Sequence, residues 1–223
     1  MGTLLGAAAG QGKNILFEAQ LGALRDIDYG IYPFTSSSNT IASYAPIGAG
    51  IPGCALDNVV GVMKAYSTCV GEGPFVAETA MGEAWNEKLR ESGGEFGAAT
   101  GRPRRVGPFD AVASRYGIRC QKAQDIALTK LDVLGAFDKI PVITGYRLHG
   151  VLLDSFPTDS RLEEAEPVIE ELPGWECDIS GCRSWKDLPE NARKYVCTLE
   201  KLVDHPIYLV STGAERDAYL LRE

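Results

Sequence analysis

The residues best suited to chemistry are three arginines in the stretch EFGAATGRPRRVG, which begins at Glu95. Arg102, Arg104 and Arg105 end a run of small residues, which we call the arginine loop (residues 98–105). Small residues let backbone N–H groups approach a ligand closely, and a guanidinium group binds a carboxylate or phosphate through two parallel hydrogen bonds. The pattern predicts an anion site, although an exposed salt-bridge patch is the ordinary alternative for an arginine-rich turn.

A second group of chemical interest is Lys130 and Asp132, in the stretch LTKLDVL at the end of an apolar run. A carboxylate there can accept hydrogen bonds from the N1–H and the exocyclic amine of guanine, while a lysine stem packs over the base. A Lys-x-Asp pair without any ligand is commoner for so short a pattern. The spacing leaves both interpretations open.

Two hydroxyl-bearing segments could complete a nucleotide site. The sequence STG (Ser211–Gly213) follows the last apolar run, where α/β proteins place ligand loops. The run from Thr35 to Ser38, next to Asn39, suits phosphate oxygens or a helix N-cap. A plain capped turn is the alternative for this second segment.

The N-terminal stretch GAAAGQGKN resembles a phosphate loop only superficially. The pattern G-x-x-x-x-G-K-[ST] requires glycine at position 7 and serine or threonine at position 14, where the chain has Ala7 and Asn14. We therefore interpret residues 1–14 as a flexible N-terminal segment. A nucleotide hydrolase that uses this stretch ranks lowest among the possible functions.

Cysteine and histidine point to no catalytic or metal site. The six cysteines include no Cys-x-x-Cys pair, and we expect reduced thiols that serve as small core residues. His149 and His205 have no acid or nucleophile at a telling spacing, which favours structural or solvent-exposed roles.

Composition narrows the class of protein. The chain has 223 residues, of which 45% are hydrophobic, and a net charge of −8, which argues against nucleic-acid binding. No stretch approaches the roughly 18 apolar residues of a membrane span, and no basic segment precedes the apolar start as in a secretion signal. We expect a cytoplasmic protein with no nucleic-acid or membrane partner.

The elements that must position these residues alternate between strands and helices, which predicts an α/β fold in one compact unit. The predicted strands are 14–20, 125–134, 139–148 and 206–213, with a helix entering a strand over 57–70 and an amphipathic helix over 187–203. Asp57 is the predicted N-cap of the first helix. The acidic, Pro-bearing segment 161–181 reads as a solvated surface connection.

Several stretches in a fixed order resemble one family. They are DIDYGIYPFTSSSNT, VVGVMKAYSTCVGEGPF, EFGAATGRPRR, LTKLDVL, ELPGW, LPENARKYV and STGAERD. Together they are similar to the carboxyl-terminal half of adenylosuccinate synthetase, over about residues 15–222. The resemblance implies a P-loop-NTPase-like mixed sheet flanked by helices, incomplete relative to the full family fold, with residues 15–223 as its C-terminal domain.

The resemblance also implies an activity and its ligands. Members of the family join IMP to L-aspartate with GTP as cosubstrate and Mg²⁺: a base removes the N1 proton of IMP, O6 attacks the γ-phosphoryl group, and aspartate displaces phosphate from C6. By position, Ala98, Ala99, Thr100, Gly101, Arg102 and Arg104 are implied to bind aspartate. Gln20, Leu21, Ser36, Val70, Gly71 and Arg102 are implied to bind IMP, and Arg104, Lys130, Leu131, Asp132, Ser211, Thr212 and Gly213 to bind GTP.

The chain departs from the family pattern in several places. An ungapped alignment puts Leu21 where the family has a nucleotide-binding glutamine, and Gln20 could serve only with a one-residue shift, which would turn its side chain to the other face. Ala99 replaces a usual threonine and Ala214 a usual proline. The phosphate loop with its base and magnesium ligands, and the acid histidine, have no counterpart here, so no catalytic or metal-binding residue is assigned.

Two further interpretations stay open at this point. The chain is either part of a purine-biosynthetic ligase, inactive alone and a homodimer or the partner of a missing N-terminal half, or a non-catalytic module that binds guanine nucleotide and IMP. A domain of the first kind should expose apolar surface where its other half packs.

Overall fold

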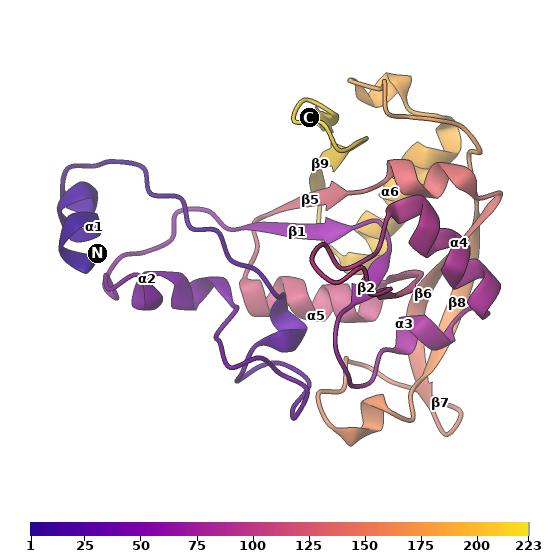
Figure 1. The fold of residues 1–223 in the computed structure, drawn as a ribbon, viewed down its shortest axis with the longest axis horizontal. Coiled ribbons are helices and arrows are strands. Elements are labelled where there is room, and N and C mark those ends of the chain that lie inside the picture. Colours follow the sequence, from indigo (N-terminus) through magenta and orange to yellow (C-terminus); the bar gives the residue numbers. More distant parts are fainter. Residues whose placement is uncertain (223) are drawn as a thin grey trace.

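The computed structural model describes residues 1–222 and shows an α/β protein whose sheets are flanked by helices (Figure 1). The helices are α1 (Gly2–Gly10), α2 (Ala45–Gly48), α3 (Val76–Thr79), α4 (Glu83–Gly93), α5 (Ala111–Gln121) and α6 (Glu190–Val203). The strands are β1 (Val60–Lys64), β2 (Ser67–Cys69), β3 (Arg105–Gly107), β4 (Phe109–Asp110), β5 (Asp125–Thr129), β6 (Lys139–Leu148), β7 (Val151–Leu152), β8 (Glu166–Pro173), β9 (Ile207–Ser211) and β10 (Tyr219–Leu221). Short 3-10 helices connect them: η1 (Ala23–Arg25), η2 (Ala42–Tyr44), η3 (Asp132–Ala136), η4 (Ser160–Leu162) and η5 (Trp185–Asp187).

The strands form two mixed sheets and a two-stranded ribbon. In the first sheet the order is β1-β5-β9-β10, with β1, β5 and β9 parallel and β10 antiparallel. In the second, β6 pairs with β4 in parallel and with β7 and β8 in antiparallel fashion. Strands β2 and β3 make the ribbon. The mixed α/β class predicted from the sequence is therefore confirmed.

Helix α6 shows how sequence pattern becomes packing. Its apolar side chains recur every three or four residues, so one face buries Ala192, Tyr195, Val196, Leu199 and Val203. The Tyr195 hydroxyl donates a hydrogen bond to the backbone carbonyl of Ala65, just beyond β1, at 2.6 Å. This bond ties the helix to the end of the strand that leads into the site.

Several predicted elements are confirmed. The strand predicted over 139–148 is β6 with the same bounds, and the helix predicted over 187–203 is α6 with a slightly later start. Strand β9 lies within 206–213. The strand predicted over 125–134 ends earlier, at Thr129, and the polar turn that follows leads into η3.

Two predicted elements were wrong. Residues 57–70 hold the strands β1 and β2 and no helix, so Asp57 caps nothing. A short apolar run does not by itself distinguish a strand from a helix, and the close pairing with β5 decides here: a Cβ on Gly61 would lie 2.8 Å from Ile126 Cδ1. Residues 14–20 are not a strand, and Leu16 is 94% exposed.

The acidic connection predicted over 161–181 was also wrong in part, since it contains strand β8. Eight positions of β8 pair with β6, and its glutamates Glu166, Glu170 and Glu171 face outward. Charged side chains on an edge strand oppose pairing with another chain, and they make such a strand look like a surface loop in sequence. The cysteines differ from expectation too: all six are free thiols, but none is fully buried.

The N-terminal residues lie to one side of the sheets. Figure 1 shows α1 and α2 at the left, joined to the rest by extended chain. Helix α1 buries no residue and touches the segment after α2, where a Cβ on Gly2 would lie 2.6 Å from the carbonyl oxygen of Gly50. Within residues 1–222, no helix is long and apolar enough to cross a bilayer.

The packing of α6 makes a stability prediction. Leu199 is fully buried, so Leu199→Ala leaves a cavity and is expected to lower the free energy of unfolding by about 2–5 kcal/mol. Urea denaturation followed by circular dichroism measures this. The matched control Lys201→Ala, on the exposed face of the same helix, is expected to change it by less than about 0.5 kcal/mol; equal losses for both variants would contradict the packing.

Candidate functional site

The centre of the site is a carboxylate, Glu95, which the sequence arguments did not assign. Its side chain is 1% exposed and lies between α4 and the arginine loop. Oε1 accepts hydrogen bonds from Lys64 Nζ at 2.7 Å and from the Tyr66 hydroxyl at 2.6 Å. Arg104 Nη1 donates to Oε2 at 3.0 Å, and Lys130 Nζ lies 3.4 Å from Oε1. Three cations therefore surround one buried carboxylate.

These contacts keep Glu95 ionised. Burial alone would raise the pKa of Glu95, but hydrogen bonds from Lys64 and Tyr66 and the charges of Lys64 and Lys130 lower it to about 2. Burial, with the neighbouring carboxylate, raises the pKa of Tyr66, so the phenol stays protonated and donates. Burial also lowers the pKa of Lys64, against the effect of Glu95.

The arginine loop is closed at its base and open at its tip. Phe96 and Pro103 form an antiparallel bridge, and the Gly97 N–H donates to the Arg102 carbonyl at 2.8 Å. The tip residues Ala98, Ala99, Thr100, Gly101 and Arg102 are all exposed. Within residues 1–222 the Arg102 guanidinium makes no hydrogen bond or ion pair, which leaves it available to a ligand.

Arg104 is fixed at the base of this loop. Its N–H donates to the Glu95 carbonyl at 2.9 Å, and its own carbonyl accepts from Arg90 Nε at 3.0 Å. Its Nε is buried with no acceptor among residues 1–222. The guanidinium thus has one arm on Glu95 and unused hydrogen-bonding capacity.

Lys130 and Asp132, the pair expected to read guanine, follow the carboxyl end of β5, which pairs in parallel with β9. Lys130 follows β5 with φ of +61°, and its Nζ donates to the Gly93 carbonyl at 2.5 Å as well as facing Glu95. Asp132 begins η3, and burial raises its pKa, an effect that the charge of Lys130 opposes and that of Asp178 reinforces. Leu131 between them is fully buried in the core.

The STG segment lies beside this pair because β9 pairs with β5. The Ser211 hydroxyl donates to the Gly213 carbonyl at 3.0 Å. Thr212 is fully buried, and its hydroxyl donates to the Cys182 carbonyl at 3.2 Å. Thr212 therefore holds the loop in place, while Ser211 and Gly213 are half-buried at the strand end.

Arg25 joins the residues expected to line the IMP pocket, and the sequence arguments missed it. Its guanidinium donates to the carbonyls of Val70 and Glu72, each at 3.1 Å, and to that of Phe34. It also donates to Cys69 Sγ at 2.8 Å. The Arg25 carbonyl accepts from the Ser36 N–H at 2.8 Å, so one residue connects the serine run to Val70 and Gly71.

The Ser36 hydroxyl sits in a local turn. It donates to the Ser38 carbonyl at 3.3 Å and accepts from the Ser38 N–H at 3.2 Å. Val70 is 71% exposed, and Gly71, with φ of +88°, is exposed as well. The Ser36 turn and the exposed Val70–Gly71 segment therefore lie on neighbouring loops that Arg25 holds together.

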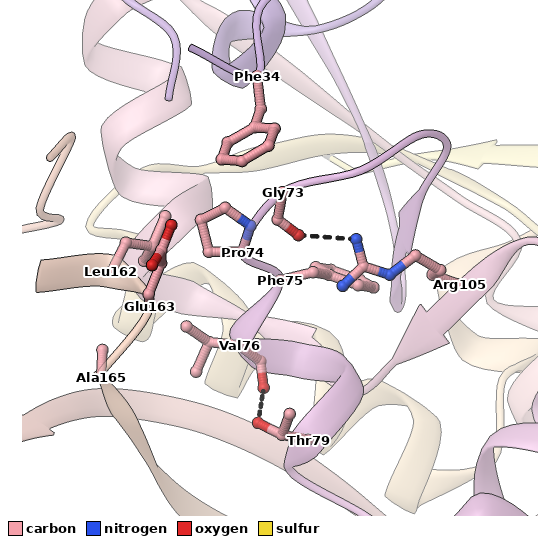
Figure 2. A pocket seen from close by; sticks show the side chains of 10 residues that line it. All are labelled: Phe34, Gly73, Pro74, Phe75, Val76, Thr79, Arg105, Leu162, Glu163 and Ala165. Carbon is pink, nitrogen blue, oxygen red and sulfur yellow. Dashed lines mark hydrogen bonds between the residues drawn. The ribbon is translucent and has the colours of Figure 1, made fainter. Parts of the chain in front are cut away.

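Arg105 also holds the loop of residues 69–73 in place. Figure 2 shows its guanidinium beside the Phe75 ring and hydrogen-bonded to the Gly73 carbonyl, in a pocket of about 340 Å³. Its contacts are Glu78 Oε2 at 2.6 Å and the carbonyls of Gly73 at 2.8 Å and Gly71 at 3.3 Å. Its donors are therefore committed within the protein, and we assign Arg105 a structural role.

Gln20 and Leu21 make no side-chain hydrogen bond or ion pair with the other site residues among residues 1–222. Both are exposed, and Leu21 has φ of +71°. His149 is exposed beside Glu164, at 3.4 Å, and His205 Nε2 lies 3.0 Å from the Gln124 carbonyl, both away from the arginine loop.

The described residues include no side-chain cluster that we assign as a magnesium site. In the described part of the chain, no three His, Cys, Asp or Glu side chains lie close enough together to hold a metal ion. Magnesium is typical of the family that the sequence resembles, but nothing here assigns its ligands.

The fold and the site together define an α/β protein with a cluster of cations at the ends of parallel strands, beside a loop rich in arginine. The family model for adenylosuccinate synthetase matches residues 1–220. The chain therefore belongs to the adenylosuccinate synthetase family.

Individual relatives agree with this assignment. The chain is 50% identical to the adenylosuccinate synthetase of Trichlorobacter lovleyi over 98% of its own length, and 49% identical to that of Pelobacter propionicus over 94%. The structure of fully ligated adenylosuccinate synthetase from Plasmodium falciparum superposes with a TM-score of 0.93 at 36% identity, covering 99% of this chain and 53% of that one. The chain spans about half the length of the curated relatives it matches.

The low pKa of Glu95 predicts how stability changes with pH. A carboxyl with a folded-state pKa of about 2 and an ordinary value of 4.5 stabilises the fold above about pH 4.5 and loses this effect as the pH falls toward 2. Glu95→Gln is expected to lower the free energy of unfolding near pH 7 by about 3 kcal/mol, with the deficit shrinking between pH 4.5 and 2. Urea titrations of both proteins at several pH values measure this; a deficit independent of pH would contradict it.

The contacts of Arg25 predict a local effect. Hydrogen bonds from a charged donor contribute about 1.5–3 kcal/mol each. Arg25→Ala is therefore expected to raise amide hydrogen exchange in residues 69–73 by at least about tenfold. Mass spectrometry measures the exchange, with Arg216→Ala, an exposed arginine on another loop, as control. Unchanged protection in Arg25→Ala would show that the two loops hold themselves in place.

Proposed function

We propose that this chain forms the substrate-binding half of a GTP-dependent ligase that joins IMP to L-aspartate and gives adenylosuccinate. The observation that supports it most is the meeting of Arg104 and Lys130 on Glu95, because it puts an arginine loop suited to a dicarboxylate next to a strand end suited to guanine. The names and the overall similarity of the relatives support the same reaction.

In this proposal the residues of the chain bind and orient the three substrates. Asp132 accepts hydrogen bonds from guanine N1–H and the exocyclic amine, the Lys130 stem packs over the base, and Ser211 to Gly213 close its edge. Phosphoryl transfer depends mainly on such positioning and on electrostatic stabilisation. No residue of this chain is proposed as the base or the acid, and no step is assigned to a metal ion.

The arginine loop binds the amino acid in the same scheme. Arg102 and Arg104 would hold the carboxylates of L-aspartate through charge-assisted hydrogen bonds, with backbone N–H groups from Ala98 to Gly101 beside them. Ser36 would bind the IMP phosphate, with Val70 and Gly71 along the nucleotide and Arg102 near its ribose. Leu21 stands where the family has glutamine, so we expect weaker IMP binding than in relatives that keep it.

The second candidate is a non-catalytic module that binds guanine nucleotide and IMP. The proposals differ in turnover. The test mixes the chain with a separately expressed N-terminal half from the Trichlorobacter lovleyi relative and supplies IMP, L-aspartate, GTP and Mg²⁺. The change in ultraviolet absorbance measures adenylosuccinate formation. Turnover by the mixture supports the ligase, while binding without turnover favours the module. Cytoplasmic location and homodimer formation remain predictions.

Reversal of base preference tests the guanine site directly. Asparagine offers one acceptor and one donor, which match the N1–H and the 2-oxo group of xanthine. Asp132→Asn is therefore expected to weaken GDP binding by at least about a hundredfold and to strengthen binding of xanthosine diphosphate.

Isothermal titration calorimetry with both nucleotides measures this preference. Asp178→Asn, a nearby exposed carboxylate, is the control and is expected to keep the preference for GDP. Equal affinity of the wild-type chain for the two nucleotides would contradict the proposed base reading.

A further inference from the structure

Glu95 is shared by two parts of the site that are far apart in sequence. Its Oε2 holds Arg104, at the base of the arginine loop, and its Oε1 faces Lys130, at the end of β5. Its backbone carbonyl also accepts from the Arg104 N–H. One buried carboxylate thus contacts the proposed amino-acid site and the proposed base site.

The surroundings of Glu95 make it rigid. Tyr66 and Lys64 hold Oε1 at 2.6 and 2.7 Å, and Tyr66 is buried beneath it. A Cβ on Gly93 would lie 2.5 Å from the Tyr66 hydroxyl, so the end of α4 packs closely on this arrangement. Because Tyr66 and Lys64 fix this carboxylate, it can orient the two more flexible cations that contact it, Arg104 and Lys130.

Both cations depend on this orientation. Lys130 has φ of +61°, which is uncommon for a residue with a side chain, and its Nζ is held by the Gly93 carbonyl and Glu95. The Arg104 side chain is 33% exposed, with one arm on Glu95. Without the carboxylate, Lys64, Arg104 and Lys130 would repel one another and separate.

We propose that Glu95 is a positioning residue that holds Arg104 and Lys130 in one arrangement and so couples binding of the amino acid to binding of the guanine base. This inference rests on the function proposed above. An amino-acid carboxylate that engages Arg104 orders the arginine loop against Glu95, and Lys130 is then held for the base. Coupling of this kind is reciprocal between the two ligands.

The test is GDP binding to the purified chain by isothermal titration calorimetry, with and without saturating L-aspartate. In the wild-type chain, aspartate is expected to tighten GDP binding by at least about fivefold. In Glu95→Gln, GDP binding is expected to weaken by at least about tenfold and to respond to aspartate by less than about twofold. Glu171→Gln removes a carboxylate from an exposed pair with Lys139 and should behave as wild type.

IMP binding separates a positioning role from general damage to the fold. Ser36, Val70 and Gly71 do not contact Glu95, and only Arg102 of the proposed IMP residues lies on the arginine loop, so Glu95→Gln should weaken IMP binding much less than GDP binding. Should that variant fail to fold, Glu95→Asp keeps the charge and withdraws the carboxylate by one methylene group. The same pattern with smaller changes is then expected.

Four results would overturn the inference. The inference fails if L-aspartate still tightens GDP binding in a folded Glu95→Gln variant. It also fails if this variant loses GDP and IMP binding to the same extent. Absence of coupling in a wild-type chain that binds GDP would also remove it while leaving the proposed function intact. A wild-type chain that binds neither GDP nor IMP would overturn the proposed function itself, and this inference with it.

Discussion

The buried carboxylate of Glu95 is the interaction on which the site depends. Three cations, Lys64, Arg104 and Lys130, come from β1, the arginine loop and the end of β5, and they would repel one another without it. The protein carries a net charge of −8, yet this spot keeps more positive than negative charge. A local surplus of that kind suits anionic substrates in a protein whose overall charge repels them.

The rest of the fold holds these groups in place. Parallel pairing of β1, β5 and β9 brings their carboxyl ends together, and α6 ties the end of β1 to the core through Tyr195. On the other side of the arginine loop, Arg105 and Arg25 bind backbone carbonyls of the 69–73 loop. The three arginines of the arginine loop thus have different roles. Arg105 binds the 69–73 loop, Arg104 uses part of its guanidinium on Glu95, and Arg102 is available to a ligand.

Much of this could be predicted from the sequence where local pattern and tertiary packing agree. Helix α6 and strand β6 follow from apolar periodicity, and the arginine loop and the Lys130–Asp132 pair were recognised from residue type and spacing. Strand β1 was missed because its strand conformation comes from pairing with β5, which is distant in sequence, and its apolar residues Val60 and Val62 are exposed. Glu95 and Arg25 were missed because most of their partners are distant in sequence, up to 47 residues away. For Glu95 the one local hint was its position just before the arginine loop.

The most direct test of the central claim is a crystal structure of the chain with GDP and L-aspartate. The account predicts guanine between the Lys130 stem and the Asp132 carboxylate, aspartate carboxylates on Arg102 and Arg104, and Glu95 still bonded to both Arg104 and Lys130. A nucleotide bound elsewhere, or Arg104 turned away from Glu95 when the amino acid binds, would contradict it.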